Sequence, residues 1–213
     1  MKNILVTGAQ GGIGASIVRM LQDAGYNVVS VTHEDADLSS AESVALLRER
    51  VTKEISSFDW VICAHGYVDT ETVWENQTSE HTQETFAVNT LSIFYIAQQF
   101  LPSLTEGGGM IAISSSAGVQ PNGRLATYSA SKAAVNALMQ AFARNKPEYR
   151  FVTICPGPTN TQMRERLAGD AAKMQSPDVI AEAVRAAIEN TEEYKSGDIL
   201  LVRDGVTTTV SRL

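Results

Sequence analysis

The chain has 213 residues, and its composition already excludes several classes of protein. Hydrophobic residues make up 44%, charged residues 19%, and only 6 residues are proline, which is typical of a globular chain and excludes intrinsic disorder. The 17 basic residues against 24 acidic ones leave a net charge of −7 without any basic run, so neither nucleic acid nor an anionic lipid surface is expected as a partner. At roughly 100–200 residues per domain, residues 1–213 are expected to form a single domain.

Apolar stretches in the sequence have the length of strands. Thr7-Gly8 interrupts the first one after three residues, whereas a signal peptide needs a core of about 7–15 apolar residues and a membrane span about 20. A cytoplasmic protein without a membrane segment is therefore expected. Cys63 and Cys155 each end an apolar run, which favours buried thiols over a disulfide or a metal site. No metal is expected.

Short apolar, β-branched runs alternate along the chain with longer segments of helical periodicity. Most of the runs are continuously apolar, as parallel strands covered on both faces should be. The predicted strands are Asn3–Val6, Asn27–Thr32, Trp60–Ala64, Met110–Ser114, Arg150–Ile154 and Ile199–Val202.

The segments between the strands are predicted to be helices. Their ranges are Gly12–Ala24, Ala41–Ser56, Ser79–Leu101, Thr127–Asn145 and Pro177–Asn190. Ser176-Pro177-Asp178 supplies a cap, a proline in the first turn and an early acid for the last helix. Strands joined by helical crossovers predict a three-layer, doubly wound α/β fold with a parallel sheet of about six to seven strands.

The first predicted strand runs directly into a glycine-rich turn, Thr7-Gly8-Ala9-Gln10-Gly11-Gly12-Ile13-Gly14, and then into a helix. Glycines allow backbone N–H groups to approach a pyrophosphate, and the positive end of the following helix favours the anion. The spacing is G-x-x-x-G-x-G rather than the G-x-G-x-x-G of the general dinucleotide fingerprint. A purely structural turn is the alternative interpretation.

Tyr128 and Lys132 are four residues apart on a predicted helix and therefore share one face. A neighbouring ammonium is expected to lower the pKa of a tyrosine toward the range of an acid–base catalyst. Upstream, Ser114-Ser115-Ser116 follows a predicted strand, and Ser115 is the preferred catalytic candidate among the three hydroxyls. Taken alone, a tyrosine and a lysine at this spacing are also common on solvated helices.

These motifs together resemble the short-chain dehydrogenase/reductase family over almost all 213 residues. The segment Thr7–Gly14 is similar to the family's TGxxxGxG, Tyr128 and Lys132 to its YxxxK, Ser115 to its serine, and Asn89 to its catalytic-helix asparagine. Further matches are Asp37-Leu38 with the pair beside the adenine ring, residues 156–161 with the PGxxxT segment that faces the nicotinamide, and residues 197–202 with the last strand.

The resemblance implies a Rossmann fold and hydride transfer between NAD or NADP and a carbonyl or alcohol carbon. Tyr128 would give or take the hydroxyl proton, Ser115 would hydrogen-bond the developing alkoxide, and Lys132 would lower the tyrosine pKa and hold the nicotinamide ribose. Asn89 would support a water of the proton relay. The implied cofactor-binding residues are Gly8, Gln10, Gly12, Ile13, Gly14, Thr32, His33, Asp37, Leu38, Ala64, His65, Gly66, Tyr128, Lys132, Pro156, Gly157, Thr159 and Thr161.

The sequence departs from the family pattern at three places. Where the family commonly reads NNAG, this chain reads Cys63-Ala64-His65-Gly66, and His65 is either catalytic or, more simply, a local hydrogen-bonding residue. Only four residues separate the second strand from Asp37-Leu38, so the sheet is expected to be trimmed after that strand. The connection from Thr161 to Ser176 is also short, which predicts a more open site or a lid supplied by another subunit.

Cofactor choice depends on charge at the end of the second strand, where an acid favours NAD and a base favours NADP. The family's acidic position falls on Thr32 and its basic one on His33, and Glu34 lies beyond the strand. The missing acid at Thr32 favours NADP weakly over NAD.

The sequence leaves the substrate open, although a small carbonyl or alcohol compound is expected. Candidate pocket residues are Val119, Gln120, Arg124, His65, Pro158 and Met163, and Arg124 is either an anion-binding group or a solvated loop residue. The resemblance also implies a homodimer or homotetramer formed through Ser79–Leu101 and Thr127–Asn145, with the tail Thr207–Leu213 at an interface or frayed. Alternatives to hydride transfer are a dinucleotide-binding sensor or scaffold without turnover and an epimerase or dehydratase.

Overall fold

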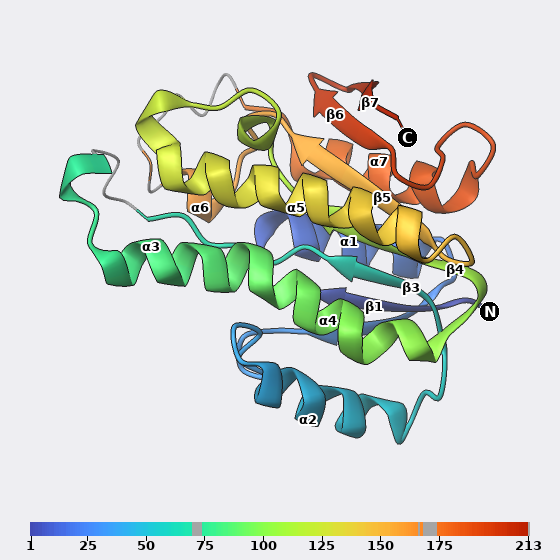
Figure 1. Cartoon of the computed structure of the whole chain (residues 1–213). Helices are drawn as coiled ribbons and strands as arrows, with labels where there is room; N and C mark the ends of the chain where they lie inside the picture. The colour runs from blue at the N-terminus through green and yellow to red at the C-terminus, as the bar shows by residue number, and fades with distance from the viewer. Residues whose placement is uncertain (70–73, 166, 168–173, 213) are drawn as a thin grey trace.

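The computed structural model describes residues 1–69, 74–165, 167 and 174–212, and its centre is one seven-stranded sheet (Figure 1). The strand order is β2-β1-β3-β4-β5-β6-β7, with all pairs parallel except the last. The strands are β1 (Asn3–Thr7), β2 (Asn27–Val31), β3 (Phe58–Cys63), β4 (Leu104–Ile113), β5 (Arg150–Pro156), β6 (Ile199–Arg203) and β7 (Val206–Ser211). The predicted doubly wound α/β fold is confirmed, and β2 forms one edge of the sheet, as the expected trimming requires.

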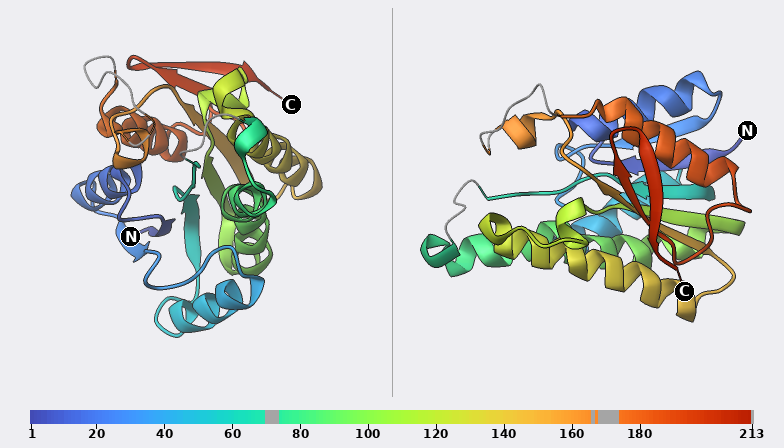
Figure 2. Two further views of the ribbon diagram at one scale, coloured as in Figure 1. Left: turned by 90° about the vertical axis from the view of Figure 1, so that its left-hand side faces the viewer. Right: turned by 90° about the horizontal axis from the view of Figure 1, so that it is seen from above.

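Helices cover both faces of the sheet and give the molecule three layers (Figure 2). The helices on one face are α2 (Ala41–Thr52), α4 (Ser92–Phe100) and α5 (Ala126–Asn145), and those on the other are α1 (Gly12–Asp23) and α7 (Pro177–Glu189). The cap predicted for α7 is present, because the Ser176 side chain accepts a hydrogen bond from the Asp178 backbone N–H. Ser40 caps α2 in the same way through Ser43 N–H.

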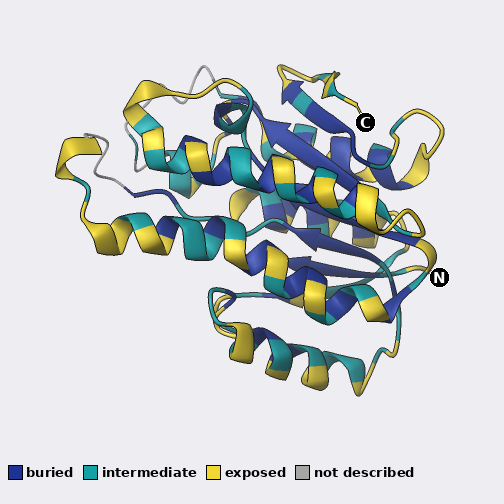
Figure 3. Ribbon diagram, viewed as in Figure 1, coloured by how far each residue is buried: buried dark blue, intermediate teal, exposed yellow. Residues whose placement is uncertain are grey.

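Two apolar cores lie between these layers. Leu5, Val61 and Met110 face the core beneath α2, α4 and α5, whereas Ile4 and Ile62 face the core beneath α1 and α7. Side chains alternate between the two faces along each strand, and both faces are covered, so the central strands are continuously apolar. Figure 3 shows the buried strands between helices whose outer faces are exposed.

The helix predicted over Ser79–Leu101 is divided into three parts. α3 (Ser79–Phe86) is followed by the π-helix η2 (Ala87–Leu91), after which α4 resumes the α-helical path and ends at Phe100. Asn89, which is 1% exposed, lies in the π-helix. Such π-turns are rare and often occur at functional sites, because they break the regular hydrogen-bond ladder and redirect a side chain. Periodicity alone does not reveal this interruption.

The strand predicted over Met110–Ser114 begins earlier, at Leu104, because three consecutive glycines belong to β4. A Cβ at Gly109 would lie 2.4 Å from the Arg150 carbonyl oxygen, so the close approach of β5 requires glycine at this position. The sequence analysis began this strand only after the three glycines.

The tail Thr207–Leu213, expected to pack at an interface or fray, contributes to an antiparallel hairpin. β6 and β7 are joined by Asp204-Gly205, both of which have positive φ values, 52° and 78°. An Asp-Gly pair between two strands is a strong hairpin signal that the sequence reading missed. Leu213 lies outside the described residues.

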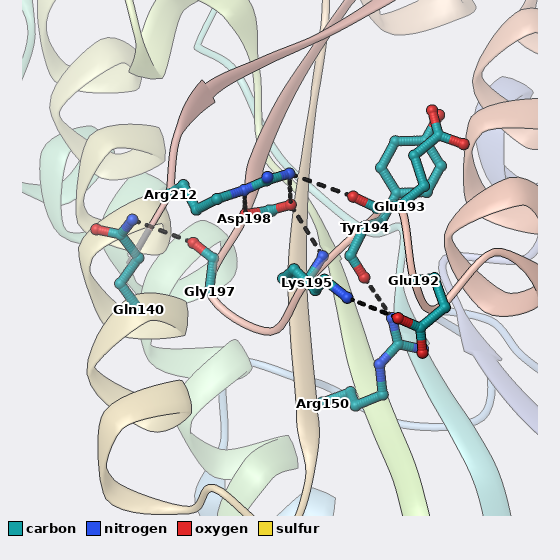
Figure 4. Close-up of polar contacts among 9 residues, drawn as sticks. All are labelled: Gln140, Arg150, Glu192, Glu193, Tyr194, Lys195, Gly197, Asp198 and Arg212. Carbon is teal, nitrogen blue, oxygen red and sulfur yellow. Dashed lines mark hydrogen bonds and ion pairs between the residues drawn. The ribbon is translucent and has the colours of Figure 1, made fainter.

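A buried carboxylate anchors this hairpin to the rest of the sheet (Figure 4). Arg212 donates from Nε to Asp198 Oδ1 and from Nη2 to Asp198 Oδ2, each over 2.9 Å, and Asp198 is fully buried. The Lys195 backbone N–H also donates to Asp198 Oδ2, and Gln140 on α5 donates to the Gly197 carbonyl. These bonds tie the end of the described chain to the loop before β6 and to α5.

Candidate functional site

A pocket lies beyond the carboxyl ends of β4 and β5, where ligands bind in doubly wound sheets. Its empty volume is about 730 Å³, a figure that includes open solvent at the mouth of the pocket. The lining residues are Ile13, Val68, Ser114, Ser115, Ser116, Ala117, Asn122, Leu125, Tyr128, Pro156, Gly157, Pro158, Thr159, Thr161, Met163, Arg164 and Leu167. The structure thus brings the glycine turn, the serine strand end, the tyrosine and the segment after β5 to one place.

The turn between β1 and α1 is so compact that Gly8 and Gly14 leave no room for a side chain. Gly8 has φ +71°, and a Cβ there would lie 2.5 Å from the His65 backbone nitrogen. A Cβ at Gly14 would lie 2.1 Å from the Gly8 carbonyl oxygen, so the helix can begin beside the strand end only with glycine in that position. Gln10, Gly11 and Gly12 are exposed at the tip of the turn.

The N-terminus of α1 suits the diphosphate group of a dinucleotide. Its N-cap is Gly11, so no side chain caps the first backbone N–H groups, and the first turn contains no acid. Uncapped amides at a helix N-terminus are natural donors to a phosphate. A cradle that side chains would fill and a free helix N-terminus together fit the cofactor that the sequence suggests.

His65 bridges the end of β1 and the first residue of α4, the helix that follows the π-helix with Asn89. Its Nδ1 lies 2.7 Å from Thr7 Oγ1, and its Nε2 lies 2.7 Å from Ser92 Oγ. Burial lowers the pKa of the imidazole to about 3, so the ring is neutral at physiological pH. His65 does not line the pocket, and the local hydrogen-bonding role is the interpretation that these contacts favour.

Asn89 is held by backbone and hydroxyl partners. Its Oδ1 accepts from the Tyr67 N–H over 2.7 Å, and its Nδ2 donates to the Tyr67 carbonyl and to Ser131 Oγ over 2.8 and 3.0 Å. A Cβ at Gly66 would lie 3.2 Å from Lys132 Nζ and 3.3 Å from Asn89 Oδ1. The loop after β3, the π-helix and α5 therefore meet around Gly66.

Tyr128 and Ser115, the two residues proposed from the sequence as catalytic, both line the pocket. The expected pKa of Tyr128 is wrong, however, because burial raises it, and the contributions that lower it come from the Ser115 hydroxyl and then from Arg164. Lys132 Nζ lies 5.9 Å from the centre of the tyrosine ring. In this structure the lysine is therefore a neighbour of the ring and not the group that tunes its hydroxyl.

Lys132 is 4% exposed and donates from Nζ to the Ile113 carbonyl over 3.0 Å. Burial lowers the pKa of its ammonium to about 8. The buried Cys63 and Cys155 are free thiols, as predicted, and burial raises their pKa values to about 12 and about 11. Neither cysteine has the thiolate character of a nucleophile.

The segment after β5 contributes Pro156, Gly157, Thr159 and Thr161 to the pocket. A Cβ at Gly12 would lie 2.9 Å from Thr161 Cγ2, so this segment packs directly against the glycine turn. The rest of the connection from Thr161 to Ser176 lies partly outside the described residues. A more open site therefore stays a prediction.

At the end of β2 the structure adds an acid that the sequence reading passed over. Asp35 Oδ2 accepts hydrogen bonds from the Thr32 N–H and from Thr32 Oγ1, both over 2.9 Å, and Arg50 also pairs with this carboxylate. His33 and Asp37 are exposed, whereas Leu38 is buried in the core beneath α2. Comparison with the family pattern identified Thr32 as the position that decides between NAD and NADP. The turn after β2 places the Asp35 carboxylate against Thr32, and this contact is visible only in the structure.

Two of the six predicted pocket residues, Pro158 and Met163, line the cavity. Val119, Gln120 and Arg124 do not line it, and Arg124 is exposed on a short 3-10 turn, as expected of a solvated loop residue. Sequence reasoning missed Arg164, which follows Thr161 by one helical turn on α6 (Gln162–Glu165). That spacing is the signal that could have identified it.

In the part of the chain that the structure describes, no helix has the length and apolar character needed to span a membrane. Within the same ranges no group of three or more His, Cys, Asp or Glu side chains gathers that could hold a metal ion.

Comparisons with known proteins agree with this fold. The profile of the family described as short chain dehydrogenase matches residues 30–172, which is more than half of the chain and begins after the glycine turn. An uncharacterized oxidoreductase of Staphylococcus saprophyticus is 26% identical, covering 93% of this chain and 95% of its own length. Acetoacetyl-CoA reductase of Synechocystis is 26% identical, with 94% of each chain covered.

Among solved structures, a putative short chain dehydrogenase of Shigella flexneri complexed with NADP superimposes with a TM-score of 0.86. It is 24% identical, with 94% of this chain and 95% of that chain covered. At this identity the likeness concerns the fold. Together with the family match, these findings show that the chain belongs to the short-chain dehydrogenase family, the NAD(P)-dependent dehydrogenases and reductases. It is an oxidoreductase of that family.

Proposed function

We propose that this enzyme transfers a hydride between a nicotinamide cofactor and the carbonyl or alcohol carbon of a small molecule, with Tyr128 as general acid and base. The observation that carries this proposal is the shared pocket of Tyr128 and Ser115 next to the glycine turn. Burial keeps the phenol of Tyr128 protonated, which suits a group that must donate a proton to the oxygen of a carbonyl being reduced.

The neighbouring residues have distinct roles in this proposal. Ser115 donates a hydrogen bond to the substrate oxygen as negative charge develops on it. Lys132, with a pKa near 8, positions the nicotinamide ribose and exchanges a proton more readily than an exposed lysine would. Asn89 keeps the loop after β3 and α5 in register through Tyr67 and Ser131, which supports a relay of protons toward solvent.

The cofactor is proposed to lie along the carboxyl ends of β1, β2, β3 and β5. The proposed binding residues are Gly8, Gln10, Gly12, Ile13, Gly14, Thr32, His33, Asp37, Leu38, Ala64, His65, Gly66, Tyr128, Lys132, Pro156, Gly157, Thr159 and Thr161. When bound, the dinucleotide supplies or accepts the hydride.

The choice between NADP and NAD rests on two opposing features. The absence of an acid at Thr32 favours NADP, and the relative from Shigella is a complex with NADP. The Asp35 carboxylate, held against Thr32, favours NAD because it would repel a 2′-phosphate and accept hydrogen bonds from ribose hydroxyls. We propose that the enzyme prefers NADP.

Residues 1–213 are proposed to act as one dinucleotide-binding and catalytic domain in the cytoplasm. A homodimer or homotetramer is proposed through the segments Ser79–Leu101 and Thr127–Asn145. Leu91 on η2 and Phe94 on α4 are exposed large apolar side chains in the first of these segments. Light scattering at micromolar concentration tests the assembly, and a monomer would contradict it.

Titration of the purified protein with NADPH and NADH tests the central proposal, with nicotinamide fluorescence and quenching of Trp60 and Trp74 as readouts. We expect micromolar binding of one form and turnover of carbonyl compounds with that form. Tyr128→Phe should bind the cofactor unchanged and lose at least about 100-fold in kcat. Binding without turnover in the wild type would instead support a sensor or scaffold, and full turnover by Tyr128→Phe would overturn the mechanism.

A further inference from the structure

Arg164 brings a positive charge into the proposed active site. It lies on α6 and lines the same pocket as Tyr128 and Ser115. Its Nε is buried and has no hydrogen-bond partner among the described residues. A buried guanidinium N–H without an acceptor is costly, and native structures usually pair such a group.

The described lining of the pocket offers no negative charge to compensate Arg164. Among the described residues that line the pocket there is no aspartate or glutamate, and Arg164 is the one charged side chain. This contrasts with the whole chain, which has a net charge of −7 because acids outnumber bases. The guanidinium also lowers the pKa of Tyr128, which indicates that its field reaches the hydroxyl where chemistry is proposed.

The rest of the lining indicates what else the ligand carries. Val68, Leu125, Met163 and Leu167 are apolar side chains in the same pocket as Arg164. A ligand that satisfies this lining has an anionic group for the guanidinium and an apolar part for these side chains. Planar, bidentate recognition of a carboxylate is the interaction that arginine makes best.

We propose that Arg164 binds the carboxylate of the substrate, so that the enzyme acts on oxo acids and the corresponding hydroxy acids. This inference rests on the proposed function, because it assigns the substrate class of that same site. In the reduction, the carbonyl carbon gains the hydride and its oxygen gains the Tyr128 proton, while the dinucleotide is oxidised and the carboxylate stays unchanged. Arg164 is thus a specificity-determining residue.

Matched pairs of acid and ester separate this role from general catalysis. The probes are 4-oxopentanoate and phenylglyoxylate, each compared with its methyl ester, which keeps the carbonyl and removes the charge. The variants are Arg164→Met, Arg164→Lys and the control Arg124→Met, which removes one positive charge from an exposed arginine outside the pocket. Steady-state turnover is measured with whichever nicotinamide form binds, and calorimetry measures probe binding directly.

We expect the wild type to prefer at least one acid over its ester by about 10- to 100-fold in kcat/KM, the range of a charge-assisted hydrogen-bonded pair. Arg164→Met should abolish that preference, because kcat/KM falls about 10- to 100-fold more for the acid than for its ester. Arg164→Lys should restore part of the preference, and Arg124→Met should match the wild type. Calorimetry should show the acid binding to the wild type but not to Arg164→Met.

Several results would overturn the inference. These are equal binding of acid and ester by the wild type, binding of neither, or an unchanged preference in Arg164→Met. If Arg164→Met instead weakens NADPH or NADH binding and leaves the ratio of acid to ester unchanged, the guanidinium serves the cofactor phosphates and the inference fails. Loss of cofactor binding and turnover in the wild type itself would be a failure of the proposed function, which the cofactor titration reports separately.

Discussion

His65 Nε2 lies 2.7 Å from Ser92 Oγ, and this contact joins the loop after β3 to the first residue of α4. Ser92 donates its own proton to the Val88 carbonyl over 2.6 Å, so its oxygen accepts from His65. The proton of the neutral imidazole is therefore on Nε2, and Nδ1 accepts from the Thr7 hydroxyl. One ring thus connects the end of β1 with the helix segment next to Asn89.

Replacing His65 by glutamine should reduce the sensitivity of the fold to acid. The pKa of His65 is about 3 in the folded chain and about 6.5 in the unfolded chain, so the unfolded state binds more protons between these values. Stability should therefore fall as pH falls below about 6.5, by about 2 kcal/mol at pH 5 from this residue alone. Glutamine can donate and accept hydrogen bonds without titrating.

Urea unfolding at pH 7 and pH 5 checks this prediction. His65→Gln should show a smaller difference between the two pH values than the wild type. The control is His33→Gln, in which an exposed histidine is replaced and the acid sensitivity should be kept. An equal loss of stability on acidification in His65→Gln and the wild type would contradict the assignment.

Lys132→Met should stabilise the protein while removing its activity. The pKa of Lys132 is about 8 instead of 10.5, so the buried ammonium costs about 3 kcal/mol of folding free energy at neutral pH. Loss of the hydrogen bond to the Ile113 carbonyl costs about 1 kcal/mol, which leaves a net gain in stability of about 2 kcal/mol.

The pH dependence of the unfolding free energy provides a second test of this prediction. Because the unfolded chain binds more protons between pH 8 and pH 10.5, Lys132 makes stability rise with pH across that window, and Lys132→Met should lack this rise. Lys146→Met, at a half-exposed lysine, serves as the control. A destabilised Lys132→Met protein at neutral pH would mean that the hydrogen bond outweighs the burial of the charge.

Gly8→Ala should lose more stability than Gly25→Ala. Both glycines have positive φ values, 71° and 84°, so alanine costs about 1–2 kcal/mol at either position. A Cβ at Gly8 would also lie within 3 Å of the backbone at Ala64 and His65, whereas a Cβ at Gly25 meets nothing within 4 Å. Thermal unfolding and the cofactor titration measure the difference, and we expect Gly25→Ala to bind the cofactor normally and Gly8→Ala to bind it poorly. Equal stabilities would show that the turn can widen without cost.

Arg212→Met should lower the thermal unfolding temperature and loosen β7, because it removes the partner of a fully buried carboxylate (Figure 4). Adding Asp198→Asn should recover part of the loss, since the buried charge is then removed as well. Lys195→Met, which breaks only the exposed pair with Glu192, should have little effect. Differential scanning calorimetry checks all three, and an unchanged unfolding temperature for Arg212→Met would show that the hairpin does not depend on this pair.

The sequence by itself determined the alternation of strands and helices, and with it the doubly wound fold. Apolar runs and helical periodicity are local properties, so they identified β1, β2, β5, β6, α1 and α7 closely. The residues of the pocket that follow strand ends, such as Ser115 and Thr161, were also predictable, because the carboxyl ends of parallel strands meet at one edge of the sheet.

Only the tertiary structure decided the features that depend on residues far apart in the chain. The π-helix around Asn89 and the glycines of β4 depend on partners in other elements, Tyr67 and Arg150. Burial of the Tyr128 side chain raises its pKa, whereas the nearby Lys132 was expected to lower it. The proposed role of Arg164 in substrate binding likewise depends on the pocket, in which no described lining residue is acidic. Burial and electrostatic fields are properties of the assembled layers, so no local pattern in the sequence could reveal them.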